Sequence, residues 1–156
     1  LLRDRRACDQ VCGIAERMLN RAFPTEGRTW MTMFTADHLT ARRLFMAGDL
    51  GRTGDVQRIA PDALASSGGM ARRQVLCTTA FAASYLPAEG NSHSDLDRVC
   101  ELLGQALPSL GSLHSARGLE RFNAVRRALA AHANRPSVQE FEDRFRTTVT
   151  AADTRM

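Results

Sequence analysis

A short segment of this chain occurs twice, and the repeat constrains the fold more than any other sequence feature. The residues Asp-Val-Gln-Arg-Ile-Ala at 55–60 return forty positions later as Asp-Leu-Asp-Arg-Val-Cys at 95–100. Five of the six positions keep the same residue type. A period of this size is typical of stacked helical hairpins, each of which buries its apolar face on its neighbours. Such an array usually holds a partner and seldom catalyses a reaction.

Residue composition and spacing favour helices throughout. The 156 residues are enough for one domain with its own core. Ala, Leu and Arg are abundant, and these side chains lose little freedom in a helix. Apolar residues recur at three- and four-residue steps, and no segment sustains the two-residue alternation of a strand. We therefore predict an all-α fold with a single domain over 1–150 and a frayed tail over 151–156.

Helix-breaking residues divide the apolar pattern into seven helices joined by turns. We expect helices at about 2–22, 30–50, 55–66, 70–86, 96–107, 112–133 and from 136 onward. Thr29 is expected to cap the second helix, and Ser92 or Ser94 the fifth. Pro61 predicts either a kink in the third helix or a helix start closer to Arg58. Together with the repeat, this pattern predicts an α-solenoid of about seven antiparallel helices.

The charge of the chain excludes some kinds of partner. Lys and Arg number 21, and all of them are Arg; Asp and Glu number 17, and the formal net charge is +4. Nucleic-acid binding needs basic residues clustered on one face, whereas here Arg is scattered among acids. No apolar run approaches the roughly 20 residues of a membrane span. We expect a cytoplasmic protein without direct DNA contact through this chain.

The residues that could carry chemistry form no catalytic or metal-binding pattern. The cysteines at 8, 12, 77 and 100 and the histidines at 38, 93, 114 and 132 lack the spacing of a zinc site. We interpret the cysteines as free, buried thiols in a reducing compartment. Ser, His and Asp occur without a nucleophile elbow. The sequence therefore predicts a protein that is not an enzyme and has neither a metal site nor a cofactor.

One hairpin resembles a degenerate tetratricopeptide repeat. The segment 44–63 contains the turn Leu-Gly-Arg-Thr-Gly-Asp-Val at 50–56, and small residues stand where the two helices of such a repeat cross. The positions that carry the resemblance, here and in the next hairpin, are Gly51, Val56, Ala60, Ala63, Ala80, Ser84, Leu96, Cys100 and Leu103. Val replaces the Ala that follows the turn in the family, and the period is longer. The resemblance implies a superhelical array with a concave groove.

Other segments resemble the repeat region of actinobacterial helix-turn-helix regulators of the XRE type. They are Leu2–Cys8, Trp30, Leu110–Arg117, Arg126–Leu129 and Pro136–Phe141. In those regulators an N-terminal DNA-binding domain precedes the repeat domain. The resemblance implies the sensor or assembly half of a transcriptional regulator, which would contact DNA only through an N-terminal domain missing from this chain. The chain opens in helical rhythm without Met, and we expect a piece of a longer protein.

The first helices of the expected hairpins carry candidate residues for partner binding. Those on the side that forms the groove in the related family are His38, Arg42, Phe45, Arg73, Phe81 and Tyr85. Aromatic side chains can hold a peptide, a protein segment or a small ligand, and a guanidinium group suits carboxylate or phosphate. The alternative is that the two Phe side chains are core, and that the arginine pairs at 42–43 and 72–73 form a solvated face.

Two functions without catalysis remain open. In the first, the chain is a binding, sensor and oligomerisation module, and ligand shifts the array between two curvatures. In the second, it is a structural scaffold that forms a homodimer. Trp30 is expected to pack between the first two helices or to act as a hot spot for self-association. A helical-bundle enzyme would need an acid/base or metal constellation, which the sequence does not contain.

Overall fold

The chain folds into helices throughout the part that the structure describes. The structure is a computed structural model, and it describes residues 4–22, 35–87, 94–110 and 115–153. Those residues contain seven α-helices, one 3-10 helix and no β-strand, so the predicted all-α fold is confirmed. The elements are α1 (Arg5–Ala22), α2 (Ala36–Asp49), α3 (Thr53–Ala65), α4 (Ala71–Ala83), α5 (Leu96–Leu110), α6 (Ala116–Leu129), η2 (Ala130–His132) and α7 (Pro136–Asp153).

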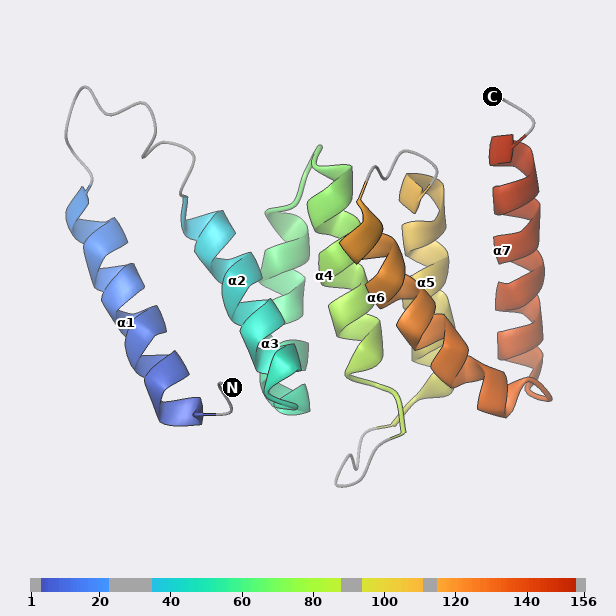
Figure 1. Cartoon of the computed structure of the whole chain (residues 1–156), viewed down its shortest axis with the longest axis horizontal. Coiled ribbons are helices and arrows are strands. Elements are labelled where there is room, and N and C mark those ends of the chain that lie inside the picture. Colours follow the sequence, from blue (N-terminus) through green and yellow to red (C-terminus); the bar gives the residue numbers. More distant parts are fainter. Residues whose placement is uncertain (1–3, 23–34, 88–93, 111–114, 154–156) are drawn as a thin grey trace.

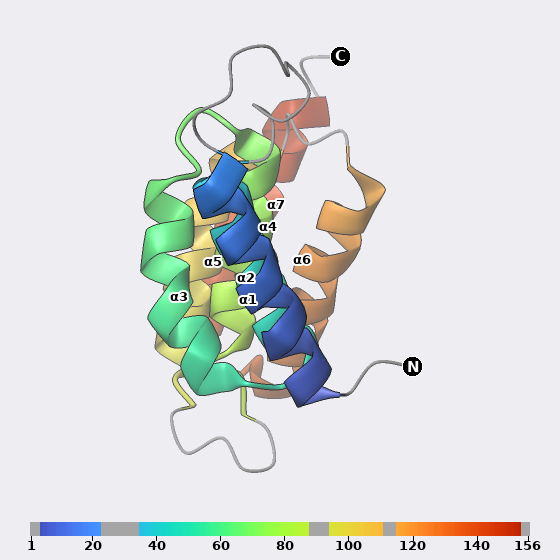
Figure 2. The ribbon, with the colours of Figure 1, turned by 90° about the vertical axis from the view of Figure 1, so that its left-hand side faces the viewer.

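Along the length of the molecule α1 to α4 follow in chain order, then α6 lies between α4 and α5, and α7 stands at the far end (Figure 1). Consecutive helices pack together from α1 to α6, and alternate helices also meet: α2 with α4, α4 with α6, and α5 with α7. The helices α2, α4 and α6 therefore form a continuous row. Viewed from the end of the molecule at which α1 lies, α3 and α6 lie on opposite sides of α2 and α4 (Figure 2). The helix α1 lies at one end of the molecule and packs on α2.

The two copies of the duplicated segment lie at or near the start of α3 and of α5. The first copy lies in the opening turns of α3, and the second begins α5. Val56 and Leu96, the second residues of the two copies, are 1% and 6% exposed. Ala60 and Cys100, the last residues, are 0% and 5% exposed. The second and the last of the six repeated positions are thus buried in both helices.

The core is mostly aliphatic and becomes aromatic at the C-terminal end. Between α6 and α7, the ring of Phe122 lies 6.4 Å from that of Phe141 and 6.1 Å from that of Phe145, measured between centroids. Such distances are typical of favourable aromatic pairs. The aliphatic side chains that are buried most completely are Leu44, Val56, Val75, Val99, Leu102, Leu103, Leu129 and Val138.

The second helix begins later than its apolar pattern predicts. Thr35 has an extended backbone, with φ −94° and ψ 168°, and its side chain accepts a hydrogen bond from the backbone N–H of His38. A residue in that conformation cannot lie inside a helix, so the predicted continuous helix over 30–50 is wrong. The expected cap Thr29 and the tryptophan Trp30 lie outside the described residues.

Two prolines lie inside helices instead of ending them. The helix α3 runs from Thr53 to Ala65 through Pro61, so the predicted start near Arg58 is wrong. The helix α5 likewise continues through Pro108. An interior proline removes one backbone hydrogen bond, at a cost of about 3 kcal/mol. Pro61 faces solvent while Ala60 and Ala63 on either side of it are fully buried, so packing on the inner face offsets that cost.

The remaining helix ends differ from expectation by a few residues. Backbone N–H of Arg98 donates to the Asp95 carboxylate at 2.9 Å, so Asp95 caps α5 in place of the expected Ser94, and Ser92 lies outside the described residues. Ser115 is extended and its hydroxyl accepts from the N–H of Gly118, so α6 begins after it and not at 112. The helix α4 ends at Ala83, three residues before the predicted end, and α7 starts at Pro136 as predicted but runs to Asp153.

The described helices were compared with the requirements of a membrane-spanning helix. None of them combines the length and the apolar composition that a bilayer crossing requires.

Candidate functional site

A cavity of about 600 Å³ opens between α2, α4 and α6. Its volume lies within the range of small-ligand sites. Three helices that are not consecutive in the chain contribute to it, because alternate helices stand side by side in the row. Apolar side chains from α2, from α4 and from the residue that precedes α4 cover part of its wall: Ala41, Phe45, Met46, Met70, Ala71 and Leu76.

The polar part of the wall is strongly basic. The described residues that line it include His38 and several arginines but a single carboxylate, that of Asp49, which lies 3.0 Å from the guanidinium of Arg121. The Arg121 guanidinium also lies 5.8 Å from the ring centroid of Phe45, within reach of a cation–π contact. Arg121 thus ties α6 to α2 across the cavity. The arginines of the wall are Arg42, Arg72, Arg73, Arg117 and Arg121.

Arg73 is a buried arginine whose hydrogen-bond partners carry no negative charge. It is 8% exposed, its Nη2 lies 2.8 Å from Nε2 of His38, and its Nη1 donates to the Ser66 carbonyl at 3.5 Å. A guanidinium group can only donate, so Nε2 of His38 must be the acceptor. The ring proton of a neutral His38 then lies on Nδ1, which is 3.3 Å from the hydroxyl of Thr35.

His38 is held in its neutral form by its surroundings. Burial is the largest cause and lowers the pKa of His38. The positive charges of Arg73 and Arg42 lower it further, and the negative charge of Asp37 has a smaller, opposite effect. The pKa of His38 therefore lies below its ordinary value near 6.5, and the ring is neutral at pH 7. A neutral ring is what the hydrogen bond from Arg73 requires.

The structure brings together four of the six side chains expected in a groove. His38, Arg42, Phe45 and Arg73 line the cavity. The other two lie away from it: Phe81 is 7% exposed and packs in the core, and the ring of Tyr85 packs against it at a tilt of 54°, with ring centroids 5.4 Å apart. The guanidinium of Arg98 from α5 covers the Phe81 ring at 5.9 Å. Phe81 and Tyr85 thus belong to the α4–α5 packing.

Sequence reasoning missed the contribution of α6. Arg117 and Arg121 both line the cavity and lie four residues apart, so they share one face of a helix. That spacing was visible in the sequence. The pairing of α6 with α4 was not, because no local pattern states which helices stand side by side. Met70, which precedes α4, was also missed, since a residue at a helix boundary has no periodic signal.

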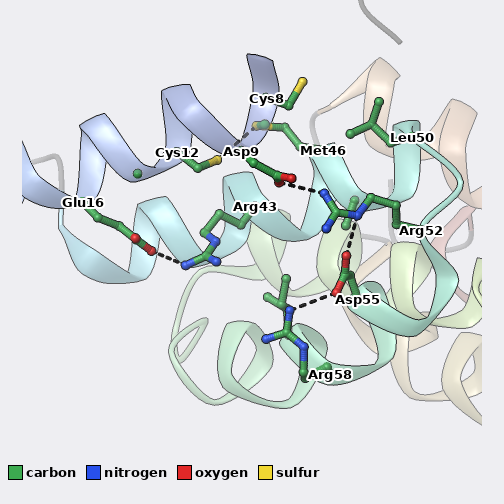
Figure 3. A pocket seen from close by; sticks show the side chains of 13 residues that line it. Cys8, Asp9, Cys12, Glu16, Arg43, Met46, Leu50, Arg52, Asp55 and Arg58 are labelled. Carbon is green, nitrogen blue, oxygen red and sulfur yellow. Dashed lines mark hydrogen bonds and ion pairs between the residues drawn. The ribbon is translucent and has the colours of Figure 1, made fainter. Parts of the chain in front are cut away.

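A second, smaller cavity of about 220 Å³ lies between α1, α2 and α3 (Figure 3). Its charges are balanced, since each of its arginines contacts a carboxylate. The pairs are Arg43 with Glu16, Arg52 with Asp9 at 2.7 Å, Arg52 with Asp55 at 2.5 Å, and Arg58 with Asp55 at 3.0 Å. This cavity is therefore an ion-paired seam that attaches α1 to the neighbouring helices.

The cysteines are free thiols in the structure. Cys77 and Cys100 are buried, and Cys8 and Cys12 are half-buried on the face of α1 that meets α2, where Cys12 Sγ lies 3.7 Å from Met46 Sδ. Burial raises the pKa of Cys12, Cys77 and Cys100, which disfavours the reactive thiolate. Across residues 4–22, 35–87, 94–110 and 115–153, no three His, Cys, Asp or Glu side chains converge as metal ligands would.

Comparison with protein-family models, with curated proteins and with solved structures found no match to this chain. The function of this chain must therefore be inferred from its own geometry.

Proposed function

We propose that this chain is a binding domain without catalytic activity, built from tetratricopeptide-like helical hairpins that stack as an α-solenoid. Two observations support the solenoid. The main helix contacts within the described residues join elements that are neighbours or alternate in the chain, as in a stack of repeats. The duplicated segment begins two helices that stand at equivalent places in successive hairpins.

The observation that carries the proposal is the cavity shared by α2, α4 and α6. A peptide, a protein segment or a small ligand that fills it would touch three alternate helices at once. Ligand contact would then favour one relative placement of these helices, and a ligand that prefers one curvature of the array would shift the array towards it. We propose that this is how the domain senses its ligand.

The wider role follows from the sequence resemblance alone. We propose that the domain serves as the sensor and oligomerisation half of a bacterial transcriptional regulator in the cytoplasm, where the DNA is read by a separate domain. The regulator resemblance in 2–8, 110–117 and 136–141 supports this role.

A peptide-display selection against the immobilised chain tests the binding function. Ala71 lines the cavity, so Ala71→Trp fills it, whereas Ala130 is exposed in η2 and Ala130→Trp leaves it open. Ligands selected on the original chain are expected to lose at least about tenfold in affinity for Ala71→Trp and to keep it for Ala130→Trp. Circular dichroism verifies that both variants fold. Equal affinity for the two variants would place binding elsewhere.

One observation favours the structural alternative, a homodimer formed through α1. Val11, Ile14 and Met18 are 62%, 48% and 67% exposed and are spaced along one side of α1. Exposed apolar side chains grouped in this way are typical of association surfaces. Sedimentation equilibrium of the chain and of a Val11→Ser, Met18→Ser variant separates the two functions. A monomer at every concentration would exclude the dimer and leave the cavity as the functional surface.

A further inference from the structure

We propose that the ligand of the large cavity is an anion: an apolar group that bears a carboxylate or phosphate, which pairs with Arg73. This inference rests on the proposed binding function and names the chemistry of its ligand. The anion can belong to a small molecule or to an acidic peptide side chain, because a guanidinium group recognises the same atoms in both.

The first support is the charge balance of the cavity wall. Among the described residues of the wall, five arginines share one carboxylate, Asp49, and that carboxylate lies against Arg121. Within the described ranges, none of the other four forms an ion pair. The small cavity near α1 provides an internal contrast, since its arginines all contact carboxylates. The large cavity therefore has an excess of positive charge that its own residues do not neutralise.

The second support is the burial of Arg73. A charged group withdrawn from water is stable only when it is paired or fully hydrogen-bonded. Arg73 is 8% exposed, and its two hydrogen-bond partners are the neutral ring of His38 and one carbonyl at the limit of hydrogen-bonding distance. Its side chain lines the cavity, so an anion that enters the cavity supplies the missing countercharge.

The third support is the apolar wall beside these arginines. Phe45 and Leu76 line the same cavity as Arg73, together with the side chains of Met46 and Met70. A free inorganic anion would leave this apolar surface in contact with water. A ligand with both an apolar and an anionic part covers it and gains the free energy of apolar burial. The ligand is thus expected to be amphipathic.

Anion binding is expected to be linked to protonation of His38, so the anion affinity should depend on pH. The charged groups that face His38 are Arg73 of α4 and Arg42 and Asp37 of α2. Burial lowers the pKa of His38 most, and the charges of Arg73 and Arg42 lower it further. A bound anion beside Arg73 offsets the effect of these charges, so anion binding promotes protonation of the ring. By reciprocity, the affinity for an anion rises as pH falls. The affinity for a neutral ligand gains nothing from this linkage.

The test compares matched probes by isothermal titration calorimetry on the full chain. The anionic probes are phenylbutyrate and phenylethyl phosphate, and the neutral control is phenylbutanamide. The peptide arm uses the capped tetrapeptide Asp-Leu-Phe-Asp against Asn-Leu-Phe-Asn. Each anion is expected to bind at least about tenfold more tightly than its neutral counterpart. The arm with the higher affinity identifies the source of the anion.

Variants locate the effect. Arg73→Gln is expected to weaken phenylbutyrate binding about tenfold, and the double variant Arg42→Gln, Arg117→Gln at exposed positions about threefold or more. The double variant keeps the test valid if Arg73→Gln does not fold. Arg127→Gln removes the same charge from an exposed position outside the cavity and is expected to bind as the original chain does. Between about pH 8 and about pH 5.5, phenylbutyrate affinity should rise in the original chain and stay level in His38→Gln.

The outcomes separate this inference from the proposed function. If phenylbutanamide or the Asn peptide binds as tightly as its anionic counterpart, and Ala71→Trp abolishes that binding, the cavity is a binding site and its anion preference is refuted. If the anions bind equally well to the cavity variants and to Arg127→Gln, their affinity is an unspecific effect of net charge, and the inference is likewise refuted. If no probe binds and the display selection also fails, the proposed function falls with it.

Discussion

Arg73 and His38 show how two residues determine the chemistry of a whole cavity. The guanidinium of Arg73 is buried and donates to the unprotonated Nε2 of His38 at 2.8 Å. The other ring nitrogen, Nδ1, is hydrogen-bonded to the hydroxyl of Thr35, the residue that caps α2. A hydrogen-bonded chain therefore runs from the start of α2 to α4, and its geometry is compatible only with a neutral imidazole.

This pair predicts the direction in which stability changes with pH. The pKa of His38 is lower in the folded state than in the unfolded chain, so unfolding takes up a proton near the unfolded value of about 6.5. The contribution of His38 to stability is complete above that pH and is lost as pH falls towards the folded pKa. We predict that the free energy of unfolding, measured with urea, falls between about pH 7.5 and about pH 5.5, and that His38→Gln reduces this fall.

His132 provides the matched control for that experiment. It lies in η2, away from the cavity, and is partly exposed. Comparing His132→Gln with His38→Gln separates the loss of a histidine side chain from the loss of the contact with Arg73. A His38→Gln variant with the full pH dependence would show that the Arg73 contact does not hold the ring neutral.

Burial differences between leucines predict the cost of truncation. Leu103 in α5 is 0% exposed and Leu119 in α6 is 39% exposed. Leu103→Ala is expected to lower the free energy of unfolding by about 3 kcal/mol, because it removes buried apolar atoms and leaves a cavity. Leu119→Ala should cost less than about 1 kcal/mol. Urea denaturation of both variants measures the difference, and equal costs would contradict the packing of α5 in the core.

At the level of elements, the existence of each helix was predictable, whereas its limits were predictable only in part. Apolar periodicity is a local property, and it indicated α1 to α7. The start of α2 depends on the conformation of Thr35, which follows a stretch with the same apolar rhythm. Pro61 lies inside α3 because buried neighbours on the inner face outweigh the local penalty. Such a balance involves other helices and cannot be judged from the segment alone.

The same limit applies to the candidate site. His38 and Phe45 were predicted from repeat register, Arg42 and Arg73 from basic pairs on successive expected hairpins, and all four line the cavity. Phe81 follows the same register but packs towards α5. Register gives the place of a residue along the array, whereas the direction of its side chain depends on how the next helix packs.

The turn between α2 and α3 gives a prediction at the element scale. Gly51 has a φ of +68°, a conformation that other residues rarely adopt. Gly54 lies within α3. A Cβ added at either position would have no neighbouring atom within 4 Å. Gly51→Ala should therefore destabilise the chain by about 1 kcal/mol through backbone strain alone. Gly54→Ala should stabilise it by up to about 1 kcal/mol. Thermal unfolding compares the two, and the same sign for both would refute the turn geometry.

At the scale of the molecule, α1 is the least integrated helix. It packs on α2 at one end of the row and is attached largely by the partly exposed ion pairs of Arg43 with Glu16 and of Arg52 with Asp9. Salt screens exposed charges. We predict that raising salt from about 0.05 M to about 0.5 M speeds amide hydrogen exchange in α1 more than in α5. Equal protection of α1 at both salt concentrations would show that apolar contacts hold it.

The cavity between α2, α4 and α6 is the central claim, and methionine methyl NMR tests it most directly. The chain has six methionines, of which Met46 and Met70 line the cavity and Met18 is exposed on α1. During titration with phenylbutyrate, and separately with phenylbutanamide, the methyl signals of Met46 and Met70 are expected to shift together with a single affinity while that of Met18 stays in place. If neither compound moves those two signals, or if Met18 moves equally, the cavity is not a binding site.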